Sequence, residues 1–549
     1  MKLAWHAVAI LALGAGLSHA QPVTIVNDVG DVPPGYCEAQ PPATCYYVDP
    51  VNGDDGAPGS FAQPWRTMVN FNESIYQGYR PPTWVGLSPG DVVYLMEGVH
   101  DTIYHPGGDG GPDDGGSCIV WFQSLQGTAD HPILVRNYPG HHAILDPGLQ
   151  GEGVVALSSS YIHIRGLHIR NAYHRGLLYR LGDHGWADHL LISETDGLAD
   201  ANIAGVEMAY SEDVELSDSI IYDNYDRTAA QSGTNTSNSC NMVIFDNTGV
   251  TSIHDNIFFQ TGDATSEFSG CGVKYKHASS EPSSTFEVYR NYFENHKYVH
   301  LGVGTHNANI HHNIMAGGTA PAISSEDWGG ATHIQHQSIS HNTFYGTGGF
   351  FVSPTLAWVN EPNGPWADLT ANAFEHNILY DTHTGYDLET RPVLFSAYMS
   401  DALYDAWRVG ITLDDNCYYN PALGMSFGFA EDPSYGTSGG VYDLAGWRTA
   451  YGWDLSSRET EPLFVDAAGL DFTPQSPDCV DKGALAGGDP IKTAKIYSIL
   501  GIDDTTSQPA LAVDDANLTE GQSGTTGMTI TVTLSEAGAT AQPDPRSTR

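Results

Sequence analysis

The chain has 549 residues, and its 22 Lys and Arg against 65 Asp and Glu give a formal net charge of −43, which excludes a broad basic face for nucleic acid. Charged residues make up only 16% of the chain and aromatic residues 11%, so the acidity does not indicate disorder. The 61 Gly residues are typical of an all-β protein with many tight corners.

The N-terminus has the pattern of an export signal. A positively charged start precedes an apolar run that ends at Leu17, and a small-x-small cleavage site ends at Ala20. The run is shorter than the ~20 apolar residues that span a bilayer. We therefore expect a cleaved signal peptide over 1–20, an N-terminal extension over 21–44, no membrane span, and a secreted or periplasmic protein.

The cysteines fit an exported chain, in which disulfides are allowed. Cys37 and Cys45 are close enough in sequence to close a small loop, and Cys240 and Cys271 are about one repeat apart, as expected on stacked turns. The odd total of seven leaves at least one thiol unpaired, and the lack of a CxxC pair argues against a zinc–thiolate site.

A five-residue pattern recurs through the middle of the chain: apolar, polar, polar or charged, Asn, apolar. A weaker copy, Leu216–Ile220, precedes it. Its Asn residues, spaced by 35, 22, 29, 35 and 39 residues, are Asn256, Asn291, Asn313, Asn342, Asn377 and Asn416. A period in this range indicates stacked supersecondary units.

The repeat predicts a parallel β-helix. Its strands have four or five residues, and Asn tolerates the left-handed conformation of a tight corner, where stacked Asn side chains can bond to one another. A propeller blade needs four strands, which 22 residues cannot hold, and a leucine-rich repeat would show a Leu ladder. We expect one all-β solenoid over 45–490 with its Asn residues in one ladder.

The two ends of this region resemble secreted right-handed parallel β-helix proteins of the pectate-lyase type. The segments that carry the resemblance are Tyr46–Asp54, Pro64–Thr67 and Gly90–Tyr94 for the first coils, and Trp447–Asp454, Pro462–Asp466 and Ser476–Gly483 for the closing coils. The resemblance implies a right-handed helix over roughly 45 to 490. It is less specific for activity, because such helices carry lyases, hydrolases and adhesins alike.

The character of the chain changes after Ser507. Apolar and polar residues alternate up to Leu534, which indicates β-strands, and the segment resembles the opening strands of a Calx-beta domain. We expect a linker over 491–510, a partial Calx-beta-like sandwich over 511–540, truncated because too few residues remain, and a tail over 541–549.

Lysine is scarce, and three of the seven lysines lie within 24 residues: Lys274, Lys276 and Lys297. Strand alternation places Val273 and Tyr275 on one face and the first two lysines on the other. If the apolar pair points into the coil, both lysines face solvent.

The same alternation on neighbouring coils brings Arg180, Glu207 and His300 to the face of Lys274 and Lys276. Strands are ~4.8 Å apart, so residues of adjacent coils lie within reach of one sugar. Three nearby residues are weaker candidates for the same site: His277, His306 and Arg290.

This set favours β-elimination on a uronate-containing polysaccharide. A base takes the C5 proton, and calcium or Arg neutralises the adjacent carboxylate. A lysine can be that base only with a lowered pKa, which a second lysine and calcium would both promote. We expect Lys274, nearer the strand centre, to be the base. The alternative is that both lysines pair with surface acids such as Glu207 or Glu267.

Calcium is the expected cofactor. Polysaccharide lyases of families six and nine, which the chain resembles, use a Lys base on such a helix with calcium held by acids on preceding coils. The resemblance implies that role for Asp223, Asp226, Asp263 and Glu267. A second candidate is the glycine-rich loop with Asp109, Asp113 and Asp114, whose carboxylates suit calcium, although a solvated acidic loop is the alternative.

Other functions stay open. A glycoside hydrolase would need two carboxylates ~5–9.5 Å apart, and its candidates are Asp246, Asp263, Glu267, Glu326 and Asp327. A non-catalytic carbohydrate-binding or adhesive protein is the third class. Histidines recur just before the Asn corner at His312, His341 and His376, which indicates stacking rather than a metal. We expect a monomer with a polysaccharide substrate, from a marine or salt-tolerant source where salt screens the charge.

Overall fold

The computed structural model describes the chain in segments. The described residues are 44–72, 81–104, 117–197, 203–227, 230, 238–261, 270–276, 284–305, 307–318, 322–326, 336–353, 372–382, 395–397, 409–422, 425, 427–428, 441–467, 471–484, 511–513 and 532–534. The signal-peptide prediction for 1–20 and most of the extension over 21–44 therefore lie outside the described residues.

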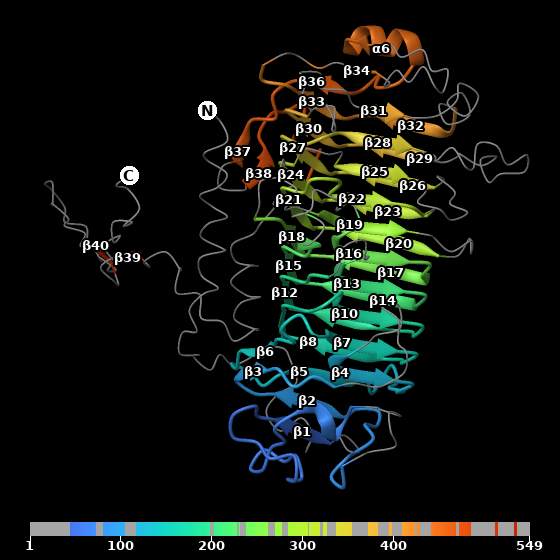
Figure 1. The fold of residues 1–549 in the computed structure, drawn as a ribbon. Helices are drawn as coiled ribbons and strands as arrows, with labels where there is room; N and C mark the ends of the chain where they lie inside the picture. The colour runs from blue at the N-terminus through green and yellow to red at the C-terminus, as the bar shows by residue number, and fades with distance from the viewer. Residues whose placement is uncertain are drawn as a thin grey trace, which may run out of the picture.

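Three parallel sheets run the length of a solenoid (Figure 1), and each coil visits them in the order sheet 2, sheet 1, sheet 3. Sheet 1 contains, in spatial order, β1 (Cys45–Val48), β2 (Val92–Leu95), β5 (Ile133–Asn137), β8 (Ile162–Arg165), β11 (Trp186–Asp188), β14 (Glu212–Ser217), β17 (Thr248–His254), β20 (Thr285–Tyr289), β23 (Ala308–His311), β26 (Gln337–Ser340), β29 (Asn372–Glu375) and β32 (Ile411–Asp414).

Sheet 2 contains β4 (Cys118–Gln123), β7 (Glu152–Leu157), β10 (Arg175–Arg180), β13 (Ala204–Ala209), β16 (Cys240–Phe245), β19 (Cys271–Lys276), β22 (Leu301–Val303), β25 (Ile323–Glu326), β28 (Phe350–Ser353) and β31 (Phe395–Ala397). Sheet 3 contains β3 (Gly98–His100), β6 (Ala143–Leu145), β9 (His168–Arg170), β12 (Leu191–Ser193), β15 (Ile220–Tyr222), β18 (Ile257–Phe259), β21 (Tyr292–Glu294), β24 (Ile314–Ala316), β27 (Thr343–Tyr345), β30 (Ile378–Tyr380), β33 (Cys417–Tyr419) and β36 (Arg458–Glu459). The predicted parallel β-helix is confirmed.

The repeated Asn residues form the predicted ladder at the two-residue corner between sheets 1 and 3. The backbone N–H of Asn256 donates to Oδ1 of Asn291 at 3.0 Å, and its Nδ2 donates to the carbonyl oxygens of Leu216 and His254, both at 2.9 Å. The same pattern continues through Asn291, Asn313, Asn342 and Asn377, and it ends at Asn416, whose backbone N–H donates to Oγ of Ser457. Each buried amide therefore satisfies carbonyl groups of two coils.

The sequence predicted the left-handed backbone conformation at the Asn of this corner. The structure has it at the residue before the Asn instead. Positive φ angles are found at Asp255 (60°), Arg290 (54°) and His312 (57°). The turn needs one residue in the left-handed conformation. The Asn that follows it points its side chain inward, where it hydrogen-bonds to the Asn residues of neighbouring coils. The predicted histidine stacking is confirmed: the rings of His312 and His341 are 5.0 Å apart, and those of His341 and His376 are 4.8 Å apart.

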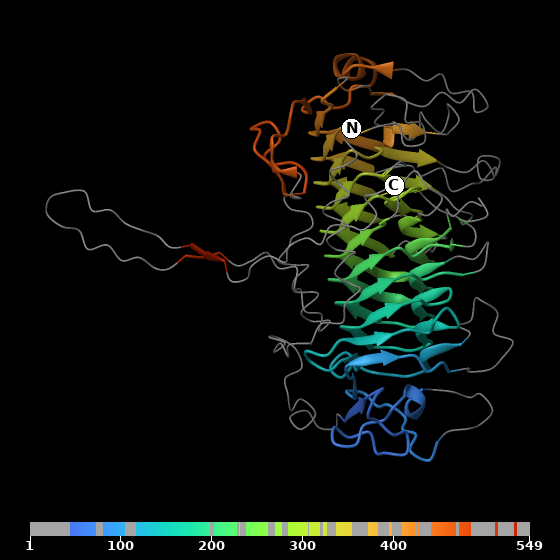
Figure 2. The same ribbon diagram turned by 60° about the vertical axis from the view of Figure 1, so that its left-hand side comes forward.

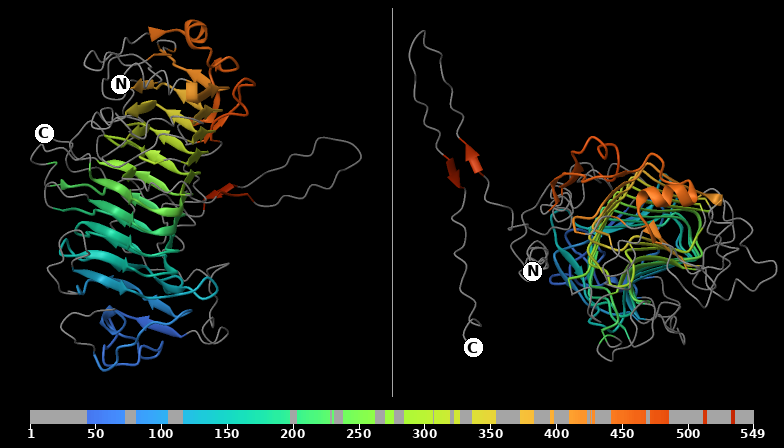
Figure 3. Two further views of the ribbon diagram at one scale, coloured as in Figure 1. Left: turned by 90° about the vertical axis from the view of Figure 1, so that its right-hand side faces the viewer. Right: turned by 90° about the horizontal axis from the view of Figure 1, so that it is seen from above.

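The three sheets enclose one space, as the view along the axis shows (Figure 3). One core of buried apolar side chains fills it. Phe258 and Phe293 stack there on successive coils with ring centroids 5.1 Å apart. Burying such side chains contributes ~1.5–3 kcal/mol each. Because every coil adds the same kind of layer, the core is continuous along the solenoid.

Disulfides join neighbouring parts of the helix. Cys240 and Cys271, register partners on β16 and β19, are bonded as expected, and a second bridge joins Cys417 to Cys479. Cys45 is disulfide-bonded, while its expected partner Cys37 lies outside the described residues. Cys118 is a free, buried thiol.

The two ends of the solenoid are closed by non-repeating structure. A short 3-10 helix (Met68–Asn70) lies in the first coil, where buried Trp65 stacks on Tyr46. At the other end (Figure 2), α6 (Leu444–Tyr451) follows β34 (Phe427–Gly428) and β35 (Val441–Tyr442). The hairpin β37 (Phe464–Asp466) and β38 (Asp471–Pro474) packs on sheet 3, with Phe472 5.1 Å from Tyr345.

Beyond the solenoid, β39 (Leu511–Val513) and β40 (Val532–Leu534) pair antiparallel. They confirm strands in the segment for which a Calx-beta-like fragment is predicted, and the identity of that fragment stays a prediction. Among the described residues, no helix is long and apolar enough to cross a membrane.

Candidate functional site

The candidate site lies on the outer face of sheet 2, around β19. Val273 and Tyr275 belong to the apolar core, so Lys274 and Lys276 point to the outside of the coil, as predicted. They do not face solvent, however, because only 5% of Lys274 and 4% of Lys276 is exposed. Burial of two ammonium groups side by side is costly, which makes this pair chemically unusual.

Strand register places the other candidates along the same face. Glu207 lies opposite Val243, which lies opposite Lys274, so the carboxylate and the amine share a row two coils apart. A second row of register partners begins at Arg180, at the end of β10, and reaches Lys276 through one residue on each of the two strands between them. The predicted grouping of Arg180 and Glu207 with the lysines on one face is what the register shows.

A buried ion network occupies the start of these strands, and sequence reasoning missed its central residue, Arg175. Its Nε donates to Oε2 of Glu207 at 2.6 Å, and its Nη1 donates to Oε1 of Glu152 at 2.9 Å. All three residues are at most 3% exposed. One guanidinium therefore bridges two carboxylates on the outer face.

Strict alternation would have placed Arg175 inside the coil with Leu177. The alternation breaks because Gly176 also faces the interior, where an added Cβ would lie 2.7 Å from Cγ2 of Ile192. Gly153 also faces the interior, one coil earlier, where an added Cβ would lie 2.5 Å from Cγ2 of Ile169. A glycine in second position of these strands is the sequence signal that could have revealed the outward Arg175.

The electrostatics of the network differ from those of free side chains. Burial and the charge of Lys274 lower the pKa of Lys276 to about 7, while Glu207 acts in the opposite direction. Lys276 Nζ donates to Oδ1 of Asn238 at 3.2 Å and lies 5.6 Å from the ring centroid of Phe245. Lys276 is thus an amine that is partly neutral near pH 7.

The acids show the complementary effect. Burial raises the pKa of Glu152 to about 7, although the charge of Arg175 opposes the shift. The pKa of Arg175 is raised, because Glu207 and Glu152 together outweigh the effect of its burial. Arg175 therefore stays charged, and Glu152 holds a proton more readily than a surface carboxyl.

The network reaches the surface at Arg180. Its side chain is 18% exposed, its Nη1 lies 3.7 Å from Oε1 of Glu207, and its guanidinium lies 5.1 Å from the ring centroid of Tyr210. Tyr210 is 45% exposed. Sequence reasoning missed Tyr210, which follows β13 at a corner with a positive φ of 52°.

His300 does not join this face, contrary to expectation. Its Nδ1 lies 2.8 Å from Nδ1 of His296, and its Nε2 lies 2.9 Å from the carbonyl oxygen of Gly317 and 3.1 Å from Oγ1 of Thr347. The ring is 1% exposed and lies near Phe293 of the core. It precedes β22, so strand alternation does not govern its direction.

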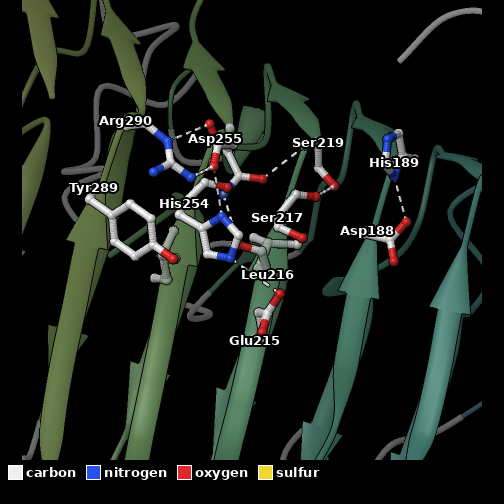
Figure 4. A network of polar contacts seen from close by, with 12 residues as sticks. Asp188, His189, Glu215, Leu216, Ser217, Ser219, His254, Asp255, Tyr289 and Arg290 are labelled. Carbon is white, nitrogen blue, oxygen red and sulfur yellow. Dashed lines mark hydrogen bonds and ion pairs between the residues drawn. The ribbon is translucent and has the colours of Figure 1, made fainter. Parts of the chain in front are cut away.

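Arg290, an extra candidate, also lies elsewhere. It pairs with Asp255 at the corner between sheets 1 and 3, with Nε 2.9 Å from Oδ1 (Figure 4). In the same network Nδ1 of His254 lies 2.8 Å from Oδ2 of Asp255, and its Nε2 lies 3.2 Å from Oε1 of Glu215. The two remaining extras, His277 and His306, lie outside the described residues.

The expected calcium ligands are only partly described. Asp223 accepts hydrogen bonds from the backbone and side chain of Thr261 on the next coil, and burial raises its pKa. Asp226 is buried near it in sequence. The other expected ligands, Asp109, Asp113, Asp114, Asp263 and Glu267, lie outside the described residues. Within the described segments, no three His, Cys, Asp or Glu residues are grouped as metal ligands.

The carboxylates expected for a hydrolase do not form a described pair. Asp263, Glu267 and Asp327 lie outside the described residues, Asp246 lies at the corner after β16, and Glu326 ends β25. On the face of the lysines, Arg175 brings Glu152 and Glu207 together, and these two carboxylates were not expected as a pair.

Comparisons with known proteins concern the architecture. A scan against protein-family models finds no match, and a search of curated proteins finds none. Among solved structures, the chain is similar to the pectate lyase Pel9A, with 15% identity, a TM-score of 0.41, and coverage of 81% of this chain and 90% of that one. An alginate lyase from a Paenibacillus species gives 15% identity, a TM-score of 0.35, and coverage of 63% and 92%.

A glycoside hydrolase appears beside these lyases. The GH136 lacto-N-biosidase from Eubacterium ramulus is 13% identical, with a TM-score of 0.37 and coverage of 69% of this chain and 64% of that one. Likenesses this distant carry no argument about activity.

Proposed function

We propose that this protein is a polysaccharide lyase that cleaves a uronate-containing chain by β-elimination, with Lys276 as the base. The observation that carries the proposal is the charge on the outer face of sheet 2. Four basic side chains, Arg175, Arg180, Lys274 and Lys276, lie there with two carboxylates, whereas the whole chain has a net charge of −43. A local excess of positive charge on so acidic a protein favours a polyanionic substrate.

The reaction needs a neutral amine beside an acidified C–H bond. Lys276 would take the C5 proton, the electrons of that C–H bond would form the C4–C5 double bond, and the C4–O bond would break as the leaving oxygen is protonated. Arg180, at the exposed edge of the network, would neutralise the uronate carboxylate and so stabilise the charge that develops.

We assign the base to Lys276 and not to Lys274, which the sequence favoured. The pKa of Lys276 is lowered to about 7, so a large fraction of the amine is neutral near pH 7. Lys274 contributes the neighbouring positive charge that promotes this shift. We therefore assign the two lysines different roles.

A hydrolase remains the second candidate because of one observation. Glu152 and Glu207 are bridged by the same guanidinium, and burial raises the pKa of Glu152 to about 7. A carboxyl group that holds its proton more readily, beside a second carboxyl group, suits a general acid and its partner. The substrate would then be a glycan whose glycosidic bond is hydrolysed.

Products distinguish the two reactions. We would incubate the full chain with a panel of uronate-containing and neutral polysaccharides and follow the ultraviolet absorbance of the C4–C5 double bond. A lyase produces this absorbance only from uronate substrates, whereas a hydrolase releases reducing ends without it. Cleavage without the double bond on every substrate would refute the lyase proposal.

A further inference from the structure

We propose that Glu207 is a positioning residue whose carboxylate, fixed by Arg175 and faced by Arg180, sets the charge state of Lys276. The catalytic meaning of this inference rests on the proposed function. The charge coupling itself can be measured without substrate.

Glu207 is held in one place. It is 0% exposed, and its Oε2 accepts a 2.6 Å hydrogen bond from Nε of Arg175. Arg175 cannot easily turn away, because its Nη1 also donates to Glu152 at 2.9 Å and contacts Nδ1 of His174 at 2.7 Å. The second oxygen of Glu207 lies 3.7 Å from Nη1 of Arg180. The carboxylate is therefore fixed from one side and only loosely contacted from the other.

Few described charges act on Lys276. Lys274 on its own strand disfavours the ammonium form, and Glu207, two coils earlier, favours it. The preceding coil contributes Phe245 and Asn238, which carry no charge. Since Lys276 is 4% exposed, water screens these charges weakly. Glu207 is thus a described acid that opposes the neutral form of this amine.

The two arginines limit the influence of Glu207. A carboxylate paired with Arg175 and facing Arg180 acts on a distant amine less strongly than a free carboxylate would. If Arg180 lost its charge, Glu207 would stabilise the ammonium form of Lys276 more strongly. If Glu207 lost its charge, the neutral amine would be favoured further. A merely structural role for the network predicts no such opposite effects.

The test measures the titration of Lys276 by NMR in the full chain labelled with [ε-¹³C]lysine. Only seven lysines are present, so the spectrum is simple, and Lys276→Arg assigns the signal. We expect Glu207→Gln to raise the ratio of neutral to ammonium form of Lys276 near pH 7 by up to about tenfold, and Arg180→Gln to lower that ratio. Glu215→Gln, the same change on sheet 1, is the matched control and should leave the titration unchanged.

Folding is checked by circular dichroism and melting temperature. If Glu207→Gln does not fold, Arg180→Gln carries the test, because Arg180 lies at the exposed edge. An unchanged Lys276 titration in folded Arg180→Gln, or shifts of equal sign in both variants, overturns the inference. If the titration shifts as expected while no polysaccharide gives unsaturated products, the inference stands and the proposed function fails.

Discussion

At the scale of single residues, the unusual feature is an ionisable pair buried on the outside of the coil. Lys274 and Lys276 are nearly inaccessible, although they point away from the core. Burial is tolerated here because Glu207 supplies opposite charge on the same face and because Lys276 can lose its proton near pH 7. Such a perturbed pair is a candidate functional site for a stated physical reason.

The first prediction concerns the base. Lys276→Ala should lower kcat by about 10²–10⁴-fold, the usual contribution of a positioned general base. Wild-type activity should rise as the pH passes about 7, because the amine must lose its proton to act. Lys276→Arg should not restore activity, since the guanidinium stays protonated. Initial rates of double-bond formation across pH test this, and full activity in Lys276→Ala would refute the assignment.

A second prediction concerns His254. Although its burial opposes the shift, hydrogen bonds with Asp255 and Glu215 raise the pKa of His254 to about 9. The folded pKa lies above the unfolded value of ~6.5, so the stabilisation is fully present below that value and is lost as the pH rises through about 9. The melting-temperature difference between wild type and His254→Gln should therefore shrink between neutral pH and pH values above 9.

The control for His254 lies on the same corner. Burial and Arg290 lower the pKa of His312, so this ring is neutral throughout that pH interval. His312→Gln should change the melting temperature by an amount that does not vary with pH there. A constant effect of His254→Gln over the same interval would contradict the assignment of the raised pKa.

At the scale of elements, the corner between sheets 1 and 3 sets the register of every coil that carries an Asn. Each Asn joins its own turn to the next one; Asn256 accepts from the backbone N–H of Ser219, and each later Asn accepts from that of the preceding Asn. In these coils the corner is two residues long, so their length varies only in the connections that border sheet 2. The face that carries the candidate site is therefore the one bordered by the variable segments.

The third prediction tests the ladder. Asn313→Ala removes bonds to the carbonyl oxygens of Val288 and His311 and leaves them buried. We expect a loss of about 2–4 kcal/mol of unfolding free energy, since each unsatisfied buried group costs about 1–3 kcal/mol. Asn309→Ala on the same strand, whose side chain donates to Glu287 at the exposed surface, should cost about 0.5 kcal/mol or less. Equal melting temperatures for both variants would contradict the ladder's importance.

At the scale of the whole molecule, a strongly acidic chain is proposed to bind an acidic polymer. The long-range field repels a polyanion, while the local field around Arg175 and the lysines attracts its carboxylates. Salt screens the long-range repulsion more than it weakens buried contacts. This balance is the physical reason to expect a salt-tolerant setting.

The fourth prediction concerns calcium. If the acids around Asp223 and in the loop with Asp109 bind calcium, a chelator should lower both the melting temperature and the activity, and added calcium should restore them. Magnesium at the same concentration is the control, because it prefers a smaller, more rigid octahedral site. Unchanged melting and unchanged activity after chelation would remove calcium from the proposal.

The sequence by itself determined the solenoid, because a β-helix is built from local repeats. The Asn spacing, the short alternating strands and the pair Cys240 and Cys271 each depend on neighbours one coil away, so a pattern with a fixed role in every coil is readable in one dimension. The outward direction of Lys274 and Lys276 followed from alternation alone for the same reason.

The tertiary structure decided what surrounds those lysines. Alternation does not show that Gly176 breaks the pattern and turns Arg175 outward, that His300 turns to His296, or that the lysines are buried rather than solvent-exposed. These features depend on contacts between coils far apart in sequence and on local bends. A pKa depends on burial and on charges at a distance in space, so only the folded chain could distinguish Lys276 from Lys274.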